Sequence, residues 1–112
     1  MTYAEVYTGL CTTLLPVTYY QWRKNDNIPD PPYLVYYYPN RSDFRADDSN
    51  YSRIEALNVE LYTSYKNMTT EALVEAVLDG MGFVYDKEEA MIESEGLYEC
   101  LYTMEVVINA ED

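Results

Sequence analysis

Residues 51–63, YSRIEALNVELYT, are the stretch of sequence that decides the predicted fold. Leu57, Val59 and Leu61 alternate with polar side chains, so the three fall on one side of an extended chain. This two-residue period is typical of a β-strand with one buried face and one face in water. We therefore predict a long strand here, within a sheet whose second face is at least partly wet.

Four other runs are rich in β-branched and aromatic residues and also predict strands. The last is the most regular, because apolar and polar side chains alternate along it and favour an antiparallel strand with one buried face. The third contains the charged residues Lys87, Glu88 and Glu89, which we expect to end it. The four runs are residues 17–22, 33–38, 83–89 and 97–108.

Two segments have helical spacing. Thr2 and Glu5 have the spacing of a capping box and precede a predicted helix over residues 3–14. Thr69 or Thr70 would cap the second helix, which we expect to end at Gly80 and Gly82. Its predicted buried stripe comprises Leu73, Ala76, Val77, Gly80 and Met81.

The resulting order is α-β-β-β-α-β-β. It predicts one α+β domain over residues 1–112, with a mostly antiparallel sheet and two helices packed on one face. Residues 23–32 (RKNDNIPDPP) hold three of the five prolines and are predicted to be a loop. Residues 39–50 (PNRSDFRADDSN) are predicted to be a second loop, and connections of that length tend to be functional or mobile.

Charge and composition exclude several classes of function. The 112 residues carry a net charge of −13, of which −11 belongs to residues 57–112, so a site that grips nucleic acid is not expected. The absence of His removes the commonest general base and metal ligand. The four glycines build no phosphate-binding loop. We expect no membrane span and no signal peptide, hence a cytosolic origin with Cys11 and Cys100 as reduced thiols.

Carboxylate pairs are the remaining candidates for chemistry. Glu88 and Glu89 would point to opposite faces of a strand and could not share a ligand there. Glu93 and Glu95 are interpreted, like Asp47-Asp48, as solvated acids. The sequence therefore predicts no catalytic residue, no metal and no cofactor.

Fourteen tyrosines are the most unusual feature of the composition. Three are consecutive, Tyr36-Tyr37-Tyr38, so they must occupy both faces of a strand. Some of these rings can fill the core of a small sheet. Others favour a protein interface, because tyrosine combines a large rigid surface with a hydroxyl group.

Several runs, in this order, cover roughly residues 17–108 and resemble the small tail-completion proteins of siphophages and prophages of Gram-positive bacteria. These runs are Pro32-Tyr-Leu-Val-Tyr-Tyr-Tyr-Pro39, Asp43-Phe-x-Ala-Asp47, Tyr51, Ile54 through Asn58-Val-Glu-Leu-Tyr-Thr63, Phe83-x-Tyr85-x-Lys87, Ile92-Glu-Ser-Glu95, Leu97-Tyr98 and Tyr102-x-Met-Glu-Val106.

The resemblance implies a tail terminator, also called a tail-to-head joining protein. Such proteins form a ring, usually a hexamer, that caps the last ring of tail-tube subunits and offers a surface to the head connector. It implies the α+β fold derived above, no catalytic residues, and a place at the head-tail junction of a virion made in the bacterial cytoplasm.

Two sets of residues follow as candidate contacts. Arg41, Phe44 and Arg45 in the loop 39–50, together with Tyr36 and Tyr38, are expected to contact a neighbouring subunit or the tail tube, because Arg and aromatic residues often dominate interfaces. A ring of six chains would carry six times −13, or −78, and DNA must slide through it without specific binding. The acids expected to face this lumen are Glu88, Glu89, Glu93 and Glu95.

Two alternatives remain open. An acidic inhibitor could mimic DNA and block a nuclease or another DNA-binding protein, provided that its acids share one surface. A carboxylate-based hydrolase is the third interpretation.

Overall fold

The structure, a computed structural model, describes residues 1–22, 28–45 and 51–109, so Asp47 and Asp48 lie outside it; the side chains of residues 43–45 and 51–52 also lie outside that description. Its helices, strands and single 3-10 turn follow one another in this order: α1 (Tyr3–Cys11), β1 (Val17–Tyr19), β2 (Tyr33–Tyr37), β3 (Arg41–Arg45), β4 (Tyr51–Thr63), α2 (Met68–Gly80), β5 (Tyr85–Ile92), η1 (Glu93–Glu95) and β6 (Leu97–Asn109).

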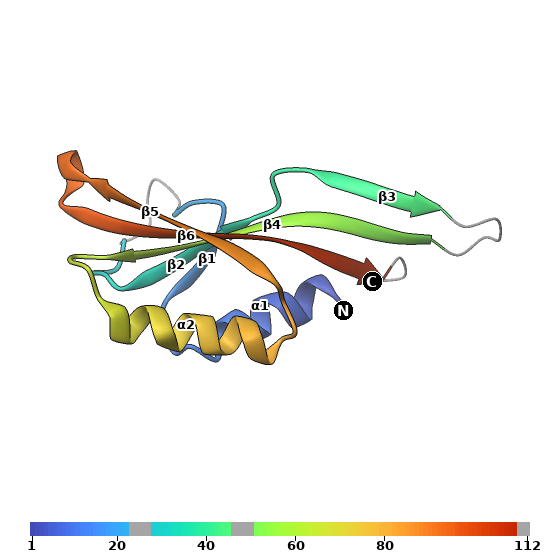
Figure 1. Cartoon of the computed structure of the whole chain (residues 1–112), viewed down its shortest axis with the longest axis horizontal. Coiled ribbons are helices and arrows are strands. Elements are labelled where there is room, and N and C mark those ends of the chain that lie inside the picture. The colour runs from blue at the N-terminus through green and yellow to red at the C-terminus, as the bar shows by residue number, and fades with distance from the viewer. Residues whose placement is uncertain (23–27, 46–50, 110–112) are drawn as a thin grey trace.

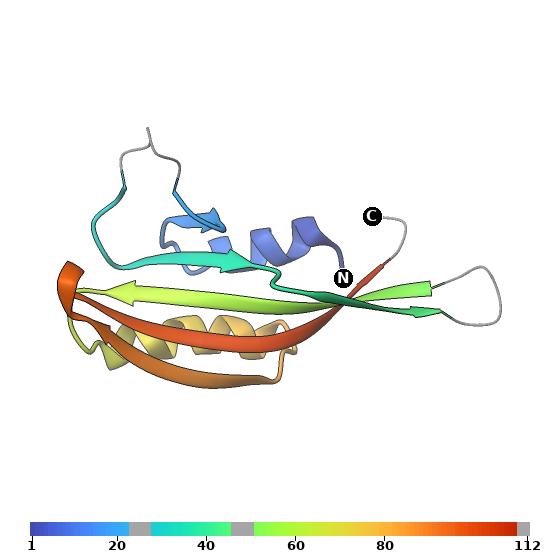
Figure 2. The same cartoon turned by 90° about the horizontal axis from the view of Figure 1, so that it is seen from above.

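The strands form one sheet. Its main order is β1-β2-β4-β6-β5, and β3 pairs with the part of β4 that β2 leaves free. The pair β1–β2 is parallel, and the other described pairs are antiparallel. Both helices cover the same face of this sheet (Figures 1 and 2). The predicted α+β fold, with a mostly antiparallel sheet and two helices on one face, is therefore confirmed.

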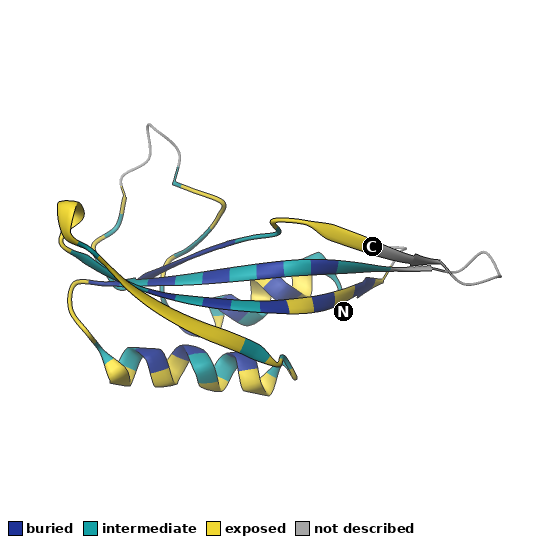
Figure 3. Ribbon diagram, turned by 45° about the horizontal axis from the view of Figure 1, so that its top comes forward, coloured by how far each residue is buried: buried dark blue, intermediate teal, exposed yellow. Residues whose placement is uncertain are grey.

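The core lies between the helices and the covered face of the sheet. Burial alternates along β4 and β6 (Figure 3), as the sequence period predicts. Val59 lies opposite Tyr102 in the register of these strands, and both side chains are fully buried. Burying apolar side chains in this way is the main source of stability for such a fold. The helices contribute Val6 and Leu10 from α1 and Val74 and Leu78 from α2.

Helix α1 starts as predicted and ends earlier. The capping box is present: the backbone N–H of Glu5 donates to Thr2 Oγ1 at 3.0 Å, and the N–H of Thr2 donates to Glu5 Oε1 at 2.8 Å. The helix ends at Cys11 rather than residue 14. The hydroxyls of Thr12 and Thr13 donate to backbone carbonyls three residues back, and Leu14 then has a positive φ of 66°. Such local hydroxyl bonds compete with continuation of a helix.

The predicted stripe of α2 is wrong. The helix is capped by Asn67, and its buried residues are Glu71, Val74 and Leu78, whereas Leu73 is 43% exposed. A search for apolar residues misses this stripe because its first member is a carboxylate, which two lysines neutralise. The residues expected there, besides Leu73, were Ala76, Val77, Gly80 and Met81.

The predicted loop over residues 39–50 is also wrong in part, because Arg41–Arg45 form β3. Strand β2 pairs only with residues 58–62 of the 13-residue strand β4. The first half of β4 therefore has a free edge, with which β3 pairs. A search for alternating apolar residues misses β3, because its sequence is mostly polar. Other strand limits also differ from the predicted ones: β1 ends at Tyr19, β2 ends at Tyr37, β5 runs from Tyr85 through its charged residues to Ile92, and β6 ends at Asn109. An edge strand with little burial does not need apolar residues.

The molecule is elongated, with principal extents of 51 × 31 × 23 Å. At one end β3, the start of β4 and the end of β6 project past the helices (Figure 1). The Pro31–Pro32 peptide bond is cis.

Candidate functional site: a tyrosine pocket and an acidic sheet face

Cys100 does not have the surroundings of a nucleophile. Both Cys11 and Cys100 are free thiols, as expected. Cys100 is buried, and burial is the main reason that its pKa rises to about 11. A reactive thiol needs the opposite shift.

Glu71, Glu89 and Cys100 form a cluster on the covered side of the sheet. Among the described residues, this cluster most resembles a metal-binding site. Ligand atoms of Glu71, Glu89 and Cys100 lie within 4.8 Å of one another. However, Lys66 Nζ lies 2.7 Å from Glu71 Oε1 and also pairs with Glu89, and Lys87 Nζ lies 2.8 Å from Glu71 Oε1. The two ammonium groups already neutralise these carboxylates, and the thiol stays protonated, so the cluster does not suit a metal ion.

The same cluster ties α2 to the sheet. Glu71 is only 3% exposed, and burial alone would raise its pKa, but the two lysines lower it below its ordinary value. Lys87 also binds Glu75 at 2.8 Å, and Glu75 accepts a hydrogen bond from the Tyr102 hydroxyl at 2.7 Å. Removal of one partner from a buried ion pair is costly, so this network fixes the helix in place.

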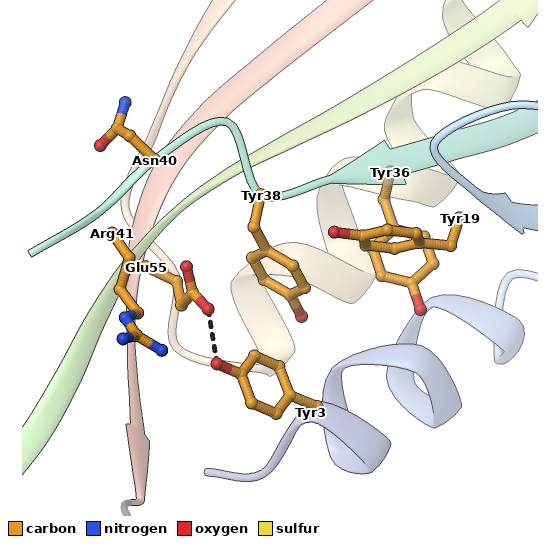
Figure 4. A pocket seen from close by; sticks show the side chains of 7 residues that line it. All are labelled: Tyr3, Tyr19, Tyr36, Tyr38, Asn40, Arg41 and Glu55. Atoms are coloured by element: carbon orange, nitrogen blue, oxygen red, sulfur yellow. Dashed lines mark hydrogen bonds between the residues drawn. The ribbon is translucent and has the colours of Figure 1, made fainter.

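A pocket of about 570 Å³ lies on the helix-covered side, between α1 and the end of β2 (Figure 4). We call it the tyrosine pocket. It is formed where β1, β2 and the β3–β4 pair meet the first turn of α1. Its lining residues are Tyr3, Tyr19, Tyr36, Tyr38, Asn40, Arg41 and Glu55.

The aromatic rings of the pocket pack edge to face. The ring centroids of Tyr3 and Tyr38 are 5.4 Å apart, those of Tyr19 and Tyr36 are 5.2 Å apart, and those of Tyr36 and Tyr38 are 6.1 Å apart. Such pairs each contribute ~1 kcal/mol beyond the area they bury. The rings therefore form one semi-rigid surface rather than independent side chains.

A buried carboxylate closes one end of this pocket. Glu55 is 7% exposed and accepts a hydrogen bond of 2.5 Å from the Tyr3 hydroxyl. This bond is the largest cause of a raised pKa at Tyr3, because the carboxylate holds the proton. Arg41 lies opposite Glu55 in the β3–β4 register and beside it in Figure 4. Rings at one end and the polar side chains of Arg41 and Glu55 at the other give the pocket an amphipathic lining.

Tyr38 contributes to the pocket a polar group whose hydrogen bonding is not satisfied by the described part of the chain. Its hydroxyl is buried without a hydrogen-bond partner among the described residues, and burial raises its pKa well above the usual range. A buried hydroxyl without a partner costs roughly 1–3 kcal/mol. A ligand atom that accepted a hydrogen bond from this hydroxyl would remove that cost.

The uncovered face of the sheet has a different character. Leu101 of β6 pairs with Glu60 on the neighbouring strand β4 and with Glu88 on the neighbouring strand β5. Glu99 of β6 pairs with Tyr62 of β4. On this face, the described residues of β1, β2, β4, β5 and β6 include no Lys or Arg. We call it the acidic face, and its carboxylates are Glu60, Asp86, Glu88, Glu99 and Glu105.

Two of these carboxyl groups form a hydrogen-bonded group with a tyrosine. The Tyr62 hydroxyl lies 3.0 Å from Glu60 Oε1 and 3.4 Å from Glu99 Oε2. Burial, followed by the hydrogen bond and repulsion from Glu60, raises the pKa of Glu99 to about 7. Near neutral pH, one proton is thus held within this hydrogen-bonded group.

The structure brings together three of the five predicted interface residues. Tyr36, Tyr38 and Arg41 line the tyrosine pocket, whereas the side chains of Phe44 and Arg45 lie outside the described ones. Local sequence offered no reason to add Tyr3, Tyr19, Asn40 and Glu55, which come from four separate segments. Tyr19 alone had a signal, since it alternates within a predicted strand.

The four predicted lumen acids are all exposed but do not share one surface. Glu88 lies on the acidic face, and Glu89 points to the covered side, where it binds Lys66 and the Tyr98 hydroxyl. The expected divergence of these two neighbours is thus confirmed. Glu93 and Glu95 lie in η1, at the turn between β5 and β6. The register shows what the sequence pattern missed: the acids of three different strands meet on one face.

Comparison of the chain with models of protein families and with curated proteins found no match. Across the described residues, neither helix has the length and apolar character needed to cross a membrane.

Proposed function

We propose that this chain is a non-enzymatic structural subunit of a phage tail, a tail terminator that caps the tail tube as a hexameric ring and joins it to the head connector. Two arguments support this proposal: the sequence resemblance over residues 17–108, and the two-sided surface of the fold. The acidic face is the observation that carries it, because a lumen through which DNA slides must repel phosphates at close range.

The acidic face makes the lumen argument more specific. The acids that would border DNA are those of the acidic face. Of the four acids that the sequence predicted for the lumen, Glu88 alone lies on this face. Glu89 contributes little there, because Lys66 neutralises it. The projecting β3–β4 end and the tyrosine pocket would then face neighbouring subunits or the tail tube.

Native mass spectrometry of the purified chain, with and without tail-tube protein, tests the ring. We expect a hexamer, either free or on the tube.

A charge-reversal pair tests the position of the acidic face in that ring. Glu88→Lys should assemble normally and retain DNA in a filter-binding assay, because the new ammonium groups would line the lumen. Asp79→Lys is the matched control: it changes an exposed acid of α2, on the other side of the sheet, by the same two units of charge. We expect no DNA retention by the control. Equal DNA retention by the two variants would contradict a lumen position for the acidic face.

An acidic DNA mimic remains the second candidate, and the same face supports it. Mimicry requires carboxylates gathered on one surface, and five of them share the acidic face. Competition against a panel of nucleases and DNA-binding proteins separates the two functions. A monomer that inhibits one of them and ignores tail tubes would replace the ring proposal with the inhibitor.

A further inference from the structure

The tyrosine pocket has solvent-exposed tyrosine rings at its entrance and, inside it, the Tyr38 hydroxyl that lacks a hydrogen-bond partner among the described residues. Tyr19 is 49% exposed although its ring packs against Tyr36 and Tyr38. Nearby, Tyr7 is 47% exposed and its ring lies 6.4 Å from that of Tyr36. Several tyrosine rings thus border one shallow site with a polar end.

Grooves lined by aromatic rings are one of the recurring ways in which proteins bind proline-rich segments. Proline rings stack on flat aromatic surfaces, and because each proline ring fixes its own φ angle, such a segment loses little entropy on binding. Proline residues also lack the N–H group, so carbonyls in such a segment are left without internal partners and accept hydrogen bonds from hydroxyl donors. A buried donor such as the Tyr38 hydroxyl suits this chemistry.

The chain itself carries a partly exposed segment of this kind. Residues 28–32 are Ile-Pro-Asp-Pro-Pro, between β1 and β2, with Ile28 61% exposed and Asp30 exposed. Three prolines in five residues form the densest proline cluster in the sequence.

The segment and the pocket lie on opposite faces of the sheet. Ile28 lines a different pocket, with Val35 and Glu60, which are cross-strand neighbours on the uncovered face. The tyrosine pocket is on the helix-covered side, where Tyr36 lies opposite Val59. The segment therefore cannot enter the pocket of its own chain, because the sheet separates them.

We propose that the tyrosine pocket binds the segment Ile28–Pro32 of a second copy of this chain. The prolines of the neighbour pack on the rings of Tyr19, Tyr36 and Tyr38, and a carbonyl of the segment accepts a hydrogen bond from the Tyr38 hydroxyl. Because the two partners of this contact are different surfaces, the contact is head-to-tail and can close into a ring. The inference rests on the ring proposed above and names the surfaces that form it.

Charge also favours this occupant. Asp30 lies in the middle of the segment, and Arg41 lines the polar end of the pocket. The chain has 20 acidic and only 7 basic residues, so a second copy offers few basic side chains that the acidic segment could contact. Opposite charges at the edge of a contact set its register and orientation more than its strength.

A labelled peptide of residues 28–33 (IPDPPY) tests the contact by fluorescence anisotropy against the whole chain. We expect saturable binding that weakens about tenfold or more in Tyr19→Ala, since removal of an anchoring ring is costly at an interface. Tyr65→Ala, which removes a 62% exposed ring that does not line the pocket, is the matched control and should bind as the unaltered chain does. Circular dichroism melts of both variants establish that they are folded.

The charge contact has its own test. Asp30→Asn in the peptide and Arg41→Gln in the chain should each weaken binding, and the loss from both changes together should be smaller than the sum of the single losses. Additive losses would overturn the proposed placement of Asp30.

Failure of the contact and failure of the ring give different results. No saturation at millimolar peptide, or equal binding of a peptide with alanine at its three proline positions, overturns the contact, whatever the mass of the whole chain on tail tubes. A chain that stays monomeric on tail tubes overturns the ring and, with it, this inference. Assembly that Tyr19→Ala abolishes and Tyr65→Ala preserves supports both.

Discussion

Replacing Glu99 with Gln should stabilise the protein at alkaline pH and leave its stability almost unchanged at acidic pH. The pKa of Glu99 is raised from 4.5 to about 7, chiefly by burial and then by Glu60. The folded state therefore keeps a proton that the unfolded state loses, so the favourable contribution of Glu99 is complete below pH 4.5 and is lost as pH rises through 7. Gln keeps the shape and the hydrogen-bonding capacity of the protonated group at every pH.

The structure sets the size of this effect. A rise in the pKa from 4.5 to about 7 corresponds to at most about 3 kcal/mol, at ~1.4 kcal/mol per pH unit. Glu99 is only partly buried, and water screens such a group, so we expect about 1 kcal/mol at pH 8. For a domain of this size, that is a rise in Tm of roughly 4–8 °C.

The assay is a series of thermal melts between about pH 4.5 and 8.5 for the unaltered chain, Glu99→Gln and Glu105→Gln. Glu105 lies on the same strand and the same face but is exposed, so its variant corrects for the loss of one negative charge from a chain of net −13. The difference between the two variants should be near zero at the acidic end, grow between about pH 4.5 and 7, and level off above about pH 7. A difference that is constant over the whole range would refute the shared proton on the acidic face.

Three further substitutions test how the fold is held together. Leu78→Ala should lower the free energy of unfolding by about 2–5 kcal/mol in urea denaturation, because it removes a fully buried side chain of α2, whereas Leu73→Ala, on the exposed side of the same helix, should cost under about 1 kcal/mol. Lys87→Met should cost about 1–3 kcal/mol, since the buried Glu71 loses one of its two ammonium partners, and the companion variant Lys87→Met, Glu71→Gln should recover part of this loss; no recovery would mean that the ion pair is not the cause. Tyr3→Phe should cost about 1–3 kcal/mol at neutral pH by removing a donor from the buried Glu55, while Tyr7→Phe on the exposed side of α1 should have an effect below about 0.5 kcal/mol.

Regular alternation made the two long strands predictable. β4 begins and ends where the period indicates, and β6 differs by one residue. These strands carry most of the core, so their pattern follows directly from burial of one face. The capping box of α1 was equally clear, because two side chains with defined roles stand three residues apart.

Features set by pairing rather than by burial were not predictable. β3 is polar and exists because β4 offers it a free edge, a fact that local sequence does not contain. The stripe of α2 includes Glu71, whose burial depends on lysines at positions 66 and 87. The same holds for the candidate sites: Tyr36, Tyr38 and Arg41 could be nominated by residue type, but their meeting with Tyr3 and Glu55 required the fold.

Electron microscopy of tail tubes assembled with and without this chain tests the central claim most directly. If the chain ends tail growth as a ring, added chain should shorten the tubes in proportion to its concentration, and an additional ring should be visible at one end of each tube. The variant Tyr19→Ala should lose this effect and Tyr65→Ala should keep it. Tubes of unchanged length with bare ends, at any concentration of the chain, would contradict the account.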